Sequence, residues 1–466
     1  MDESLTIHRR KFLGIIAGYA ALPACGDTAI ILDTSPHPEG HIHEIDRFIS
    51  SGDDCDGRAI NRAIDHAHEQ GGGIVLLDSR EYKTSVPISL KSRVRLRGRG
   101  KTRTRIRQTG TPEAWSRFSA GAIISTRNEG VYESIHIEDL SLQGAYPTPI
   151  PSDAPFFAKN GIAILNARNS SIQRCAVSDV GTGMGFFGRA AKGPHRNLIS
   201  DCTVRNASSW VGLGNPGTPR GITMATDYST ISNCVVDASH TGYYVATEHG
   251  VYRNCVARGW RDDGFYVNAN FCHLDRCQAI AADKRVQGSG SGFAVNPSHH
   301  NLFTGCEALR CPNSGMRFRH AGKMAPTDNR VVNCSFIDCG YGFLDDMIGT
   351  DPYPAAVARR NEFTGNTARD CQLCGFLFIR ETDGIFRKNR AISNNRGGVT
   401  AQHKGGIAFA EYCLNNVIED NECDDPEKVK TQKWGLYIYP QSVTRASVAN
   451  VGNRIRHRSK YGIDVI

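Results

Sequence analysis

The residues of this chain best suited to bind an acidic group lie in one short segment. Arg317 and Arg319 are two residues apart, so on an extended strand both side chains point to the same face, and His320 and Lys323 follow closely. Each guanidinium carries a planar fork of donors that matches a carboxylate. The segment therefore predicts an anion-binding surface. An ordinary solvated face is the alternative, because exposed strands commonly carry charged side chains.

Other polar and aromatic candidates occupy equivalent places in neighbouring segments. Each segment starts with a glycine followed by alternating apolar residues, so the second and fourth residues after the glycine are expected to face outward. Aromatic rings, amides and cations on one outer face are the layout expected of a sugar-binding groove. The outward candidates are Tyr244, Tyr266, Asn268, Asn296, Arg317, Arg319 and Asp346. The adjoining turns contribute Glu248, His249, Asp262, Asp263, His299, His300, Arg380, Glu381, Asp383 and Glu411.

One chemistry that could use these residues is removal of the C5 proton of a uronate. A cation neutralises the adjacent carboxylate and a base then takes the proton, which leads to β-elimination or to epimerisation. Arg317 and Arg319 would neutralise the carboxylate, and His320, Tyr266 or His249 would move the proton. Substrate binding would fall to Tyr244, Asn268, Asn296, Arg317, Lys323, Arg380 and Glu381. Ca²⁺ held by Asp and Glu assists some reactions of this kind, and no other cofactor is expected.

The other chemistry is hydrolysis by two carboxylates that flank the scissile bond, which are about 5–5.5 Å apart for retention and further apart for inversion. Asp345 would lie at an inward position, where an unpaired charge is costly, so either its strand is bulged or it has a buried partner. Sequence alone leaves the choice between elimination, epimerisation and hydrolysis open. The carboxylates available are Glu248, Asp262, Asp263, Asp345, Asp346 and Glu381.

The glycine-led segments form an internal repeat from residue 161 to the end of the sequence. Their spacing averages about 27 residues, which is typical of one coil of a solenoid. A weaker copy is placed at Gly185. The clear copies begin at Gly161, Gly221, Gly242, Gly264, Gly292, Gly315, Gly342, Gly375, Gly406, Gly435 and Gly462.

A second marker follows each glycine and predicts a column inside the solenoid. Residues one coil apart in a parallel β-helix stack about 4.8 Å from each other. Stacked Asn side chains can pair amide to carbonyl, and stacked Cys packs as a small apolar residue. These cysteines are therefore expected to be buried thiols; Cys371 and Cys374 have no second pair that would suggest zinc. The column consists of Cys175, Cys202, Cys234, Cys255, Cys277, Cys306, Cys334, Asn366, Asn389, Asn421 and Asn453.

The segment before the repeat is expected to close the open end of the solenoid. Asp56 would cap a helix with one apolar face, and glycines 71–73 would end it before a strand over 74–77. Tyr82 and the alternating strand that ends at Gly98 follow. This arrangement resembles the N-terminal coil of the pectate-lyase-like (pectin-lyase-fold) superfamily of right-handed parallel β-helices. The resemblance covers about residues 50–466.

The resemblance implies an all-β, right-handed parallel β-helix of about 12 coils with an N-terminal capping helix. The superfamily includes polysaccharide lyases, uronate epimerases, glycosidases and phage tailspikes, so the fold alone does not give the reaction. The sequence lacks the Asp-Pro-His motif of mannuronan epimerases, the signature set of polygalacturonases, and the Arg-x-Pro-x-x-Arg segment of pectate lyases.

The N-terminus has the features of an export signal. Arg9 and Arg10 precede an apolar stretch that ends near Ala24 and is too short to span a membrane, and the segment resembles bacterial twin-arginine signals. The stretch closes on Cys25 in a sequence similar to a lipoprotein box, which implies a lipid anchor. The expected organisation is a signal at 1–25, a linker at 26–50 and one β-helix domain at 51–466, of which 51–160 form the cap and first coils and 161–466 the regular coils.

Composition narrows the remaining function classes. Gly is 48 of 466 residues and charged residues are 22%, which excludes collagen, coiled coil and wholesale disorder. The net charge of +8 favours anionic partners, but there is no compact basic block beyond 93–107, so nucleic acid is not expected. The sequence thus favours an exported (periplasmic, secreted or lipid-anchored) enzyme that acts on an acidic polysaccharide by elimination or epimerisation. The alternatives are a glycoside hydrolase and a non-catalytic, carbohydrate-binding or tailspike-like solenoid.

Overall fold

The structure is a computed structural model, and it describes residues 41–110, 115, 121–127, 130–145, 160–188, 194–207, 219–281, 290–321, 324–348, 357–398, 405–410, 413–432, 434–438 and 454–459. These residues belong to one unit, Gly40–Ile466. The predicted export signal and Cys25 lie outside the described residues. No helix among the described residues is long and apolar enough to cross a membrane.

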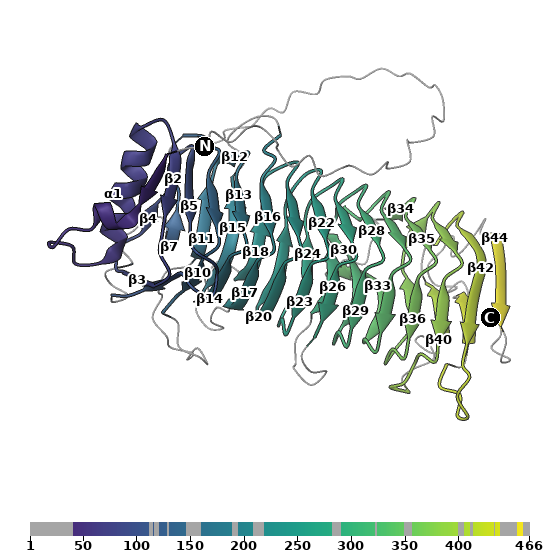
Figure 1. The fold of residues 1–466 in the computed structure, drawn as a ribbon. Helices are drawn as coiled ribbons and strands as arrows, with labels where there is room; N and C mark the ends of the chain where they lie inside the picture. Colours follow the sequence, from purple (N-terminus) through teal and green to yellow (C-terminus); the bar gives the residue numbers. More distant parts are fainter. Residues whose placement is uncertain are drawn as a thin grey trace, which may run out of the picture. The chain divides into compact units, whose positions relative to one another are not determined.

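Each coil consists of three short strands, and every strand pairs in parallel with its counterpart one coil away (Figure 1). The first strand of each coil joins a 13-stranded sheet, called sheet B below. Sheet B is made of β4 (Ile88–Ser89), β7 (Ala122–Ser125), β11 (Asn160–Leu165), β15 (Thr182–Phe187), β18 (Arg220–Met224), β21 (Thr241–Val245), β24 (Phe265–Val267), β27 (Ser291–Val295), β30 (Ser314–Ala321), β33 (Tyr341–Ile348), β37 (Phe376–Phe378), β41 (Gly405–Phe409) and β43 (Trp434–Ile438).

The second and third strands of each coil form two columns of a 27-stranded sheet, called sheet A. The first column is β1 (Ile42–Glu44), β2 (Gly73–Leu76), β5 (Val94–Arg97), β9 (His136–Glu138), β13 (Ser171–Gln173), β16 (Leu198–Ser200), β19 (Thr230–Ser232), β22 (Val251–Arg253), β25 (His273–Asp275), β28 (Leu302–Thr304), β31 (Arg330–Val332), β35 (Glu362–Thr364) and β39 (Ile385–Arg387).

The second column is β3 (Glu81–Thr84), β6 (Arg105–Gln108), β10 (Ser141–Gln143), β14 (Ala176–Val180), β17 (Thr203–Ala207), β20 (Val235–Ser239), β23 (Val256–Arg258), β26 (Gln278–Ile280), β29 (Glu307–Leu309), β32 (Ser335–Ile337), β36 (Thr367–Arg369) and β40 (Arg390–Ile392). The longer β42 (Val417–Asp424) and β44 (Arg454–Ser459) extend across both columns. Two short pairs remain, which are β8 (Tyr132–Glu133) with β12 (Ala167–Arg168) and β34 (Ala358–Arg359) with β38 (Glu381–Thr382).

The fold is therefore the predicted right-handed parallel β-helix, and helix α1 (Asp56–Glu69) packs on its N-terminal coil (Figure 1). The apolar face of α1 is buried, as its spacing predicted. Two details of the prediction are wrong. The N-cap is Cys55 and Asp56 is the first helical residue, whose carboxylate instead accepts from the backbone N–H of Lys83. Strand β1 and the 3-10 helix η1 (Ile45–Phe48) lie within 26–50, so the folded region begins before residue 51.

The glycine at the start of each sheet B strand allows neighbouring coils to approach closely. A Cβ on Gly264 would lie 2.7 Å from the carbonyl oxygen of Gly292 on the next coil, which no side chain tolerates. This contact explains the period of the repeat. The register also moves the weak copy of the repeat by two residues. Gly185 pairs with Ala163 and with Thr223, which lie two residues after a repeated glycine, so Gly183 occupies the position of the repeated glycine.

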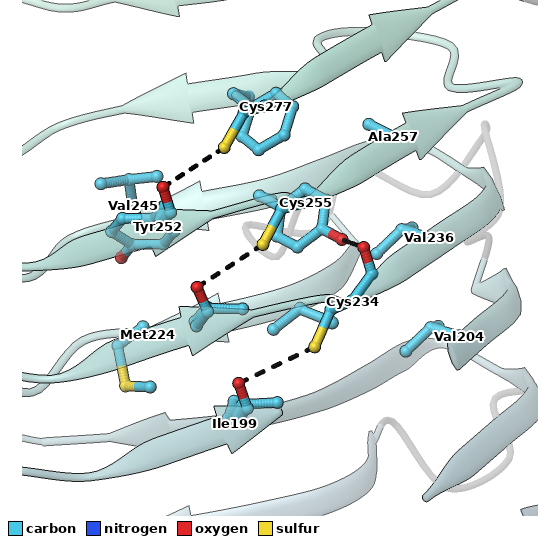
Figure 2. Packing of buried hydrophobic residues seen from close by; sticks show 14 of the residues in the cluster. Ile199, Val204, Met224, Cys234, Val236, Val245, Tyr252, Cys255, Ala257 and Cys277 are labelled. Atoms are coloured by element: carbon cyan, nitrogen blue, oxygen red, sulfur yellow. Dashed lines mark hydrogen bonds between the residues drawn. The ribbon is translucent and has the colours of Figure 1, made fainter. Parts of the chain in front are cut away.

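The predicted inner column of cysteines and asparagines is present at the turn between the two columns of sheet A. Its cysteines are buried, and Figure 2 shows Cys234, Cys255 and Cys277 directing their sulfur atoms at carbonyl oxygens one coil back, at 3.8, 3.6 and 3.4 Å. All 15 described cysteines are free thiols. Among the described residues, no group that could hold a metal ion includes Cys371 or Cys374.

The asparagine part of the column pairs amide to carbonyl, as predicted. Asn366 donates to Asn389 at 3.0 Å, and Asn389 donates to Asn421 at 3.0 Å. The predicted next member, Asn453, lies outside the described residues. The residue opposite Asn421 in the register of β44 is His457.

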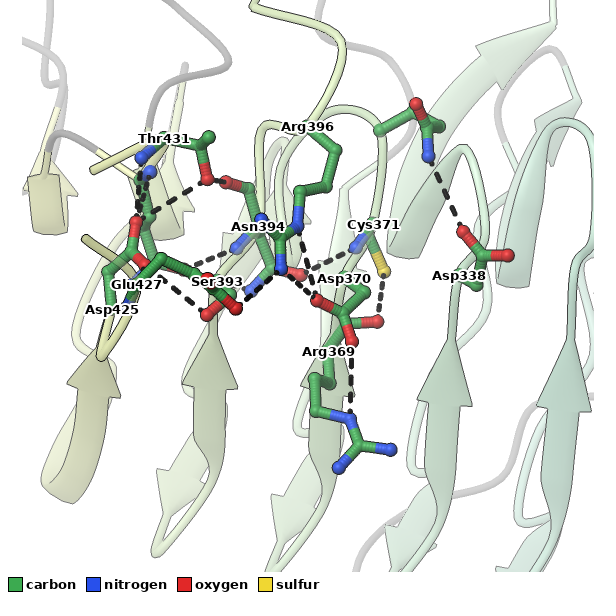
Figure 3. Close-up of polar contacts among 12 residues, drawn as sticks. Asp338, Arg369, Asp370, Cys371, Ser393, Asn394, Arg396, Asp425, Glu427 and Thr431 are labelled. Atoms are coloured by element: carbon green, nitrogen blue, oxygen red, sulfur yellow. Dashed lines mark hydrogen bonds and ion pairs between the residues drawn. The ribbon is translucent and has the colours of Figure 1, made fainter. Parts of the chain in front are cut away.

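A further buried column, at the turn that leads back to sheet B, was not predicted. The backbone N–H of Cys371 donates to the side-chain oxygen of Asn394 at 3.1 Å, and the Asn394 amide nitrogen in turn donates to Gln432 at 2.9 Å. Figure 3 shows how the chain reaches this point: the Asp425 carboxylate accepts from the backbone N–H of Thr431 at 2.7 Å and fixes the turn. Buried polar groups of the C-terminal coils are thus satisfied by side chains of the same type one coil apart.

Candidate functional site

The outer face of sheet B carries a row of stacked cations and aromatic rings between β18 and β30, called the outer row below. The guanidinium carbon of Arg220 lies 3.3 Å from the ring centre of Tyr244, and the rings of Tyr244 and Tyr266 are stacked 5.6 Å apart. The guanidinium carbon of Arg319 lies 5.5 Å from the ring centre of Tyr266. Arg317 is half-buried on the same strand. Cation–π contacts of this kind hold the side chains in place.

Amide groups fix the two tyrosine hydroxyls. Asn268 donates to the Tyr244 hydroxyl oxygen at 3.3 Å, and Asn296 donates to the Tyr266 hydroxyl oxygen at 2.5 Å. Each asparagine directly follows the sheet B strand one coil beyond its tyrosine. Because each hydroxyl oxygen accepts from an amide, its own hydrogen is directed elsewhere and can be donated to a ligand.

Asp263 provides a carboxyl group that is fully buried beneath the outer row. It accepts from the backbone N–H of Ser291 at 2.9 Å and lies 3.2 Å from a guanidinium nitrogen of Arg319. Burial raises the pKa of Asp263 to about 7, and the nearby positive charge of Arg319 opposes this shift only in part. At neutral pH this carboxyl group can therefore either hold or accept a proton.

A second pair of titratable groups lies at the edge of the outer row. Nε2 of His240 is 3.9 Å from a carboxylate oxygen of Asp262, and both side chains are partly exposed. Burial lowers the pKa of His240, and the charge of Asp262 opposes this shift. His240 and Asp262 lie at equivalent places in consecutive coils, just before β21 and β24.

The structure brings together most of the residues predicted for the outward columns. Tyr244, Tyr266, Asn268, Asn296 and Arg319 are in mutual contact, and Asp262 and Asp263 lie beside them. Asp346 pairs with Arg319 in the register of β33, but its side chain is not among those described. Lys323 lies outside the described residues.

His320, Arg380 and Glu381, which were predicted to line the groove, are all buried. His320 follows the outward Arg319, so strand alternation turns it inward, where Nε2 contacts Asp345. This contact is the buried partner that the inward position of Asp345 required. The register of β30 and β33 is continuous, so the strand is not bulged.

Glu381 lies in the same interior region and binds Asn361 through both carboxyl oxygens. Burial raises its pKa well above the usual value, and the charge of Asp345 raises it further. The raised pKa favours the protonated form of Glu381 in the folded protein.

His249 lies on a different surface from the outer row. It has a left-handed backbone with φ of 56° and is stacked between Tyr228 and Phe271, and Phe271 stacks in turn on His300. No hydrogen bond or ion pair joins His249 to the described residues of the outer row. The predicted role of His249 in proton transfer thus has no support from its position.

Sequence reasoning missed Arg220 and His240. Both precede the glycine of their strands, whereas only positions after the glycine were considered to face outward. The turn into sheet B breaks the strict alternation and brings these positions to the outer row. A basic residue directly before the repeated glycine was the one available signal for Arg220.

The described residues do not fit a calcium site. Among them, no group of three or more His, Cys, Asp or Glu side chains could hold a metal ion. The carboxylates nearest the outer row, Asp262 and Asp263, are engaged with His240, Ser291 and Arg319.

Comparison with known proteins supports the fold. The family profile described as "Right handed beta helix region" matches residues 220–344, which include the whole outer row. A comparison with curated proteins finds no match.

Several solved structures share the fold at low sequence identity. The tailspike protein of E. coli bacteriophage HK620, a double mutant in complex with a pentasaccharide, is 14% identical with a TM-score of 0.55 and covers 89% of this chain and 78% of its own. Gene product 12 of bacteriophage phi29, in its pre-mature form, is 14% identical with a TM-score of 0.55 and covers 90% and 56%. The catalytic unit of a GH87 alpha-1,3-glucanase from Streptomyces thermodiastaticus is 13% identical with a TM-score of 0.50 and covers 92% and 70%.

Proposed function

We propose that this protein is a carbohydrate-active enzyme that binds an acidic polysaccharide on the outer face of sheet B and removes the C5 proton of a uronate residue. The observation that carries the proposal is the outer row itself. Arginines flank two stacked tyrosines directly above a buried carboxyl group whose pKa is about 7. The likeness to a tailspike crystallised with a pentasaccharide and to a glucanase is consistent with a carbohydrate ligand.

Each side chain then has a distinct part in the reaction. Arg317 and Arg319 bind the uronate carboxylate and stabilise the negative charge that develops on it when C5 loses its proton. Tyr266, whose hydroxyl oxygen is held by Asn296 and whose ring faces Arg319, takes the C5 proton as the phenolate, and the hydroxyl formed can return that proton to the departing glycosidic oxygen. Asp263 holds the Arg319 guanidinium in position, because the two groups are in direct contact.

Loss of the C5 proton leaves an electron pair with two outcomes. In elimination the pair forms the C4–C5 double bond, the bond from C4 to the glycosidic oxygen breaks, and that oxygen takes up a proton. In epimerisation a proton returns to C5 from the opposite face. The arrangement of the outer row is compatible with both outcomes.

Product analysis on polygalacturonate and polymannuronate tests this proposal. Elimination creates unsaturated ends that absorb ultraviolet light, and epimerisation incorporates deuterium from heavy water without chain cleavage. Arg317→Ala should reduce the rate by about 100-fold, because a charge-assisted hydrogen bond to the substrate is worth about 1.5–3 kcal/mol. The matched control Arg258→Ala removes an exposed arginine from sheet A and should have no effect.

A glycoside hydrolase is the second candidate, and the raised pKa of Asp263 favours it. Asp262 is partly exposed, and Asp263 has the raised pKa of a general acid but no exposed surface, so hydrolysis requires its side chain to turn toward the groove. Reducing ends without unsaturated products would select this candidate. Binding without any of these products would instead identify a carbohydrate-binding protein.

We also infer that the enzyme is exported, from the twin-arginine segment at the N-terminus. Replacing both Arg9 and Arg10 with lysine should leave the unprocessed precursor in the cytoplasm. Fractionation of cells that carry the two forms would show it, and equal export of both would reject this route.

A further inference from the structure

Arg220 is a cation of the outer row without a matching acid. It is half-buried, and its guanidinium lies flat against Tyr244. Within the part of the chain that the structure describes, no hydrogen bond or ion pair joins Arg220 to an Asp or Glu side chain. Burial lowers the pKa of this arginine, and no carboxylate opposes the shift.

Several exposed arginines of sheet A have the carboxylate partner that Arg220 lacks. Arg330 and Arg390 each lie within 3.1 Å of a carboxylate oxygen one coil away. Contact with one aromatic ring replaces only part of the hydration that a guanidinium loses. Arg220 therefore offers donors that an anion in the groove could satisfy.

The position of Arg220 relative to Arg319 limits what that anion can be. Their strands, β18 and β30, are four strand spacings apart, about 19 Å. Arg319 leans back toward Tyr266, and the stacked contacts between the two arginines place their guanidinium carbons no more than roughly 14 Å apart. Because Arg220 approaches Tyr244 from the side of β18 and Arg319 approaches Tyr266 from the side of β30, the two stacked rings lie between the guanidinium groups, and a single carboxylate cannot contact both.

We propose that Arg220 is a second carboxylate subsite, so that the ligand is a continuous run of acidic sugars rather than an isolated uronate within a neutral chain. This inference rests on the proposed function. The first acidic group binds at Arg317 and Arg319, the chain crosses the stacked tyrosines, and a further acidic group of the same chain binds at Arg220. A neutral glycan, or one with widely separated uronates, satisfies only one end of the outer row.

Calorimetric titration with oligogalacturonates and oligomannuronates, from monomer to hexamer, tests the inference. Wild-type affinity should rise by about tenfold at the length where one oligomer first reaches both ends of the row. Arg220→Ala should lose this step and bind long oligomers about tenfold more weakly, while the affinity for the shortest ligands stays the same. Arg220→Lys should retain part of the step, since it keeps the charge but loses the planar fork.

Controls separate this role from support of Tyr244. Arg258→Ala removes an exposed arginine from β23 and should reproduce the wild-type length dependence. If Arg220→Ala weakens binding of all lengths equally, or of none, the second subsite is wrong even if the protein acts on uronates. If the wild-type protein binds no uronate oligomer of any length, the proposed function itself fails and the subsite with it.

Discussion

The buried carboxyl group of Asp263 leads to a prediction about how stability depends on pH. Its side chain has no exposed surface, and its pKa is raised from 3.8 to about 7. In the unfolded chain this proton is released near the lower value, whereas the folded protein keeps it until about pH 7. Between these two pH values the folded state holds more protons than the unfolded state, so stability falls as the pH rises.

The size of the effect follows from the shift. One pKa unit corresponds to about 1.4 kcal/mol, so the contribution of Asp263 should fall by about 1.4 kcal/mol per pH unit and by about 4 kcal/mol in total. Above about pH 7 the contribution is constant, because the carboxyl group is then ionised in both states. Asp263→Asn cannot ionise, and its amide oxygen can still accept from the Ser291 N–H. The variant should therefore lack this part of the pH dependence.

Urea unfolding of both proteins between about pH 4 and pH 8 measures the difference directly. The stability of the wild type relative to Asp263→Asn should decrease steadily with rising pH and level off near pH 7. Asp237→Asn, which removes a half-buried carboxylate from the outer face of β20 on sheet A, serves as the control and should follow the wild type. A constant difference between wild type and Asp263→Asn would refute the reasoning, since it would mean that Asp263 does not hold a proton in the folded state.

Three further predictions concern the interior. In the same urea assay, Asn389→Ala should lower the free energy of unfolding by about 3–5 kcal/mol, because it leaves buried hydrogen-bonding groups of two neighbouring coils without a partner. Cys255→Ala should lower it by only about 1–2 kcal/mol. Of the described thiols, only Cys55 should react with a thiol reagent in the native protein, and the remainder should react after unfolding; early labelling of more would contradict the buried columns. Because burial raises the pKa of Glu381, the free energy of unfolding should fall as the pH rises above about 4.5. Glu381→Gln should remove this pH dependence. An unchanged pH dependence in the variant would show that Glu381 is ionised in the folded protein.

The sequence predicted the parts of this protein that repeat. Glycine recurs because a Cβ at that position would strike the next coil, and cysteine or asparagine recurs because only small or self-pairing side chains fit the inner turn. Both constraints act in every coil, so they leave a period that can be seen without a structure. The outward positions after the glycine, such as Tyr266 and Arg319, follow from the same register.

What the sequence did not predict lies at the ends of the strands. There the chain turns, and alternation no longer tells whether a side chain faces inward or outward. Arg220 and Asp263 each come directly before the repeated glycine, yet one joins the outer row and the other is buried beneath it. The register of β42 and β44 also shifts between Glu419 and Asn421, and His457 lies opposite Asn421.

The unpaired thiols have a consequence for how the chain must reach its native state. Sixteen cysteines can be joined in pairs in about two million ways. None of these pairings is present among the 15 described thiols, so every disulfide formed between them before folding would have to be undone. Once the coils have closed, the sulfur atoms of the columns are out of reach of oxidants in solution. The order of events therefore matters: this chain can tolerate oxidising surroundings after it has folded but would be trapped by them beforehand.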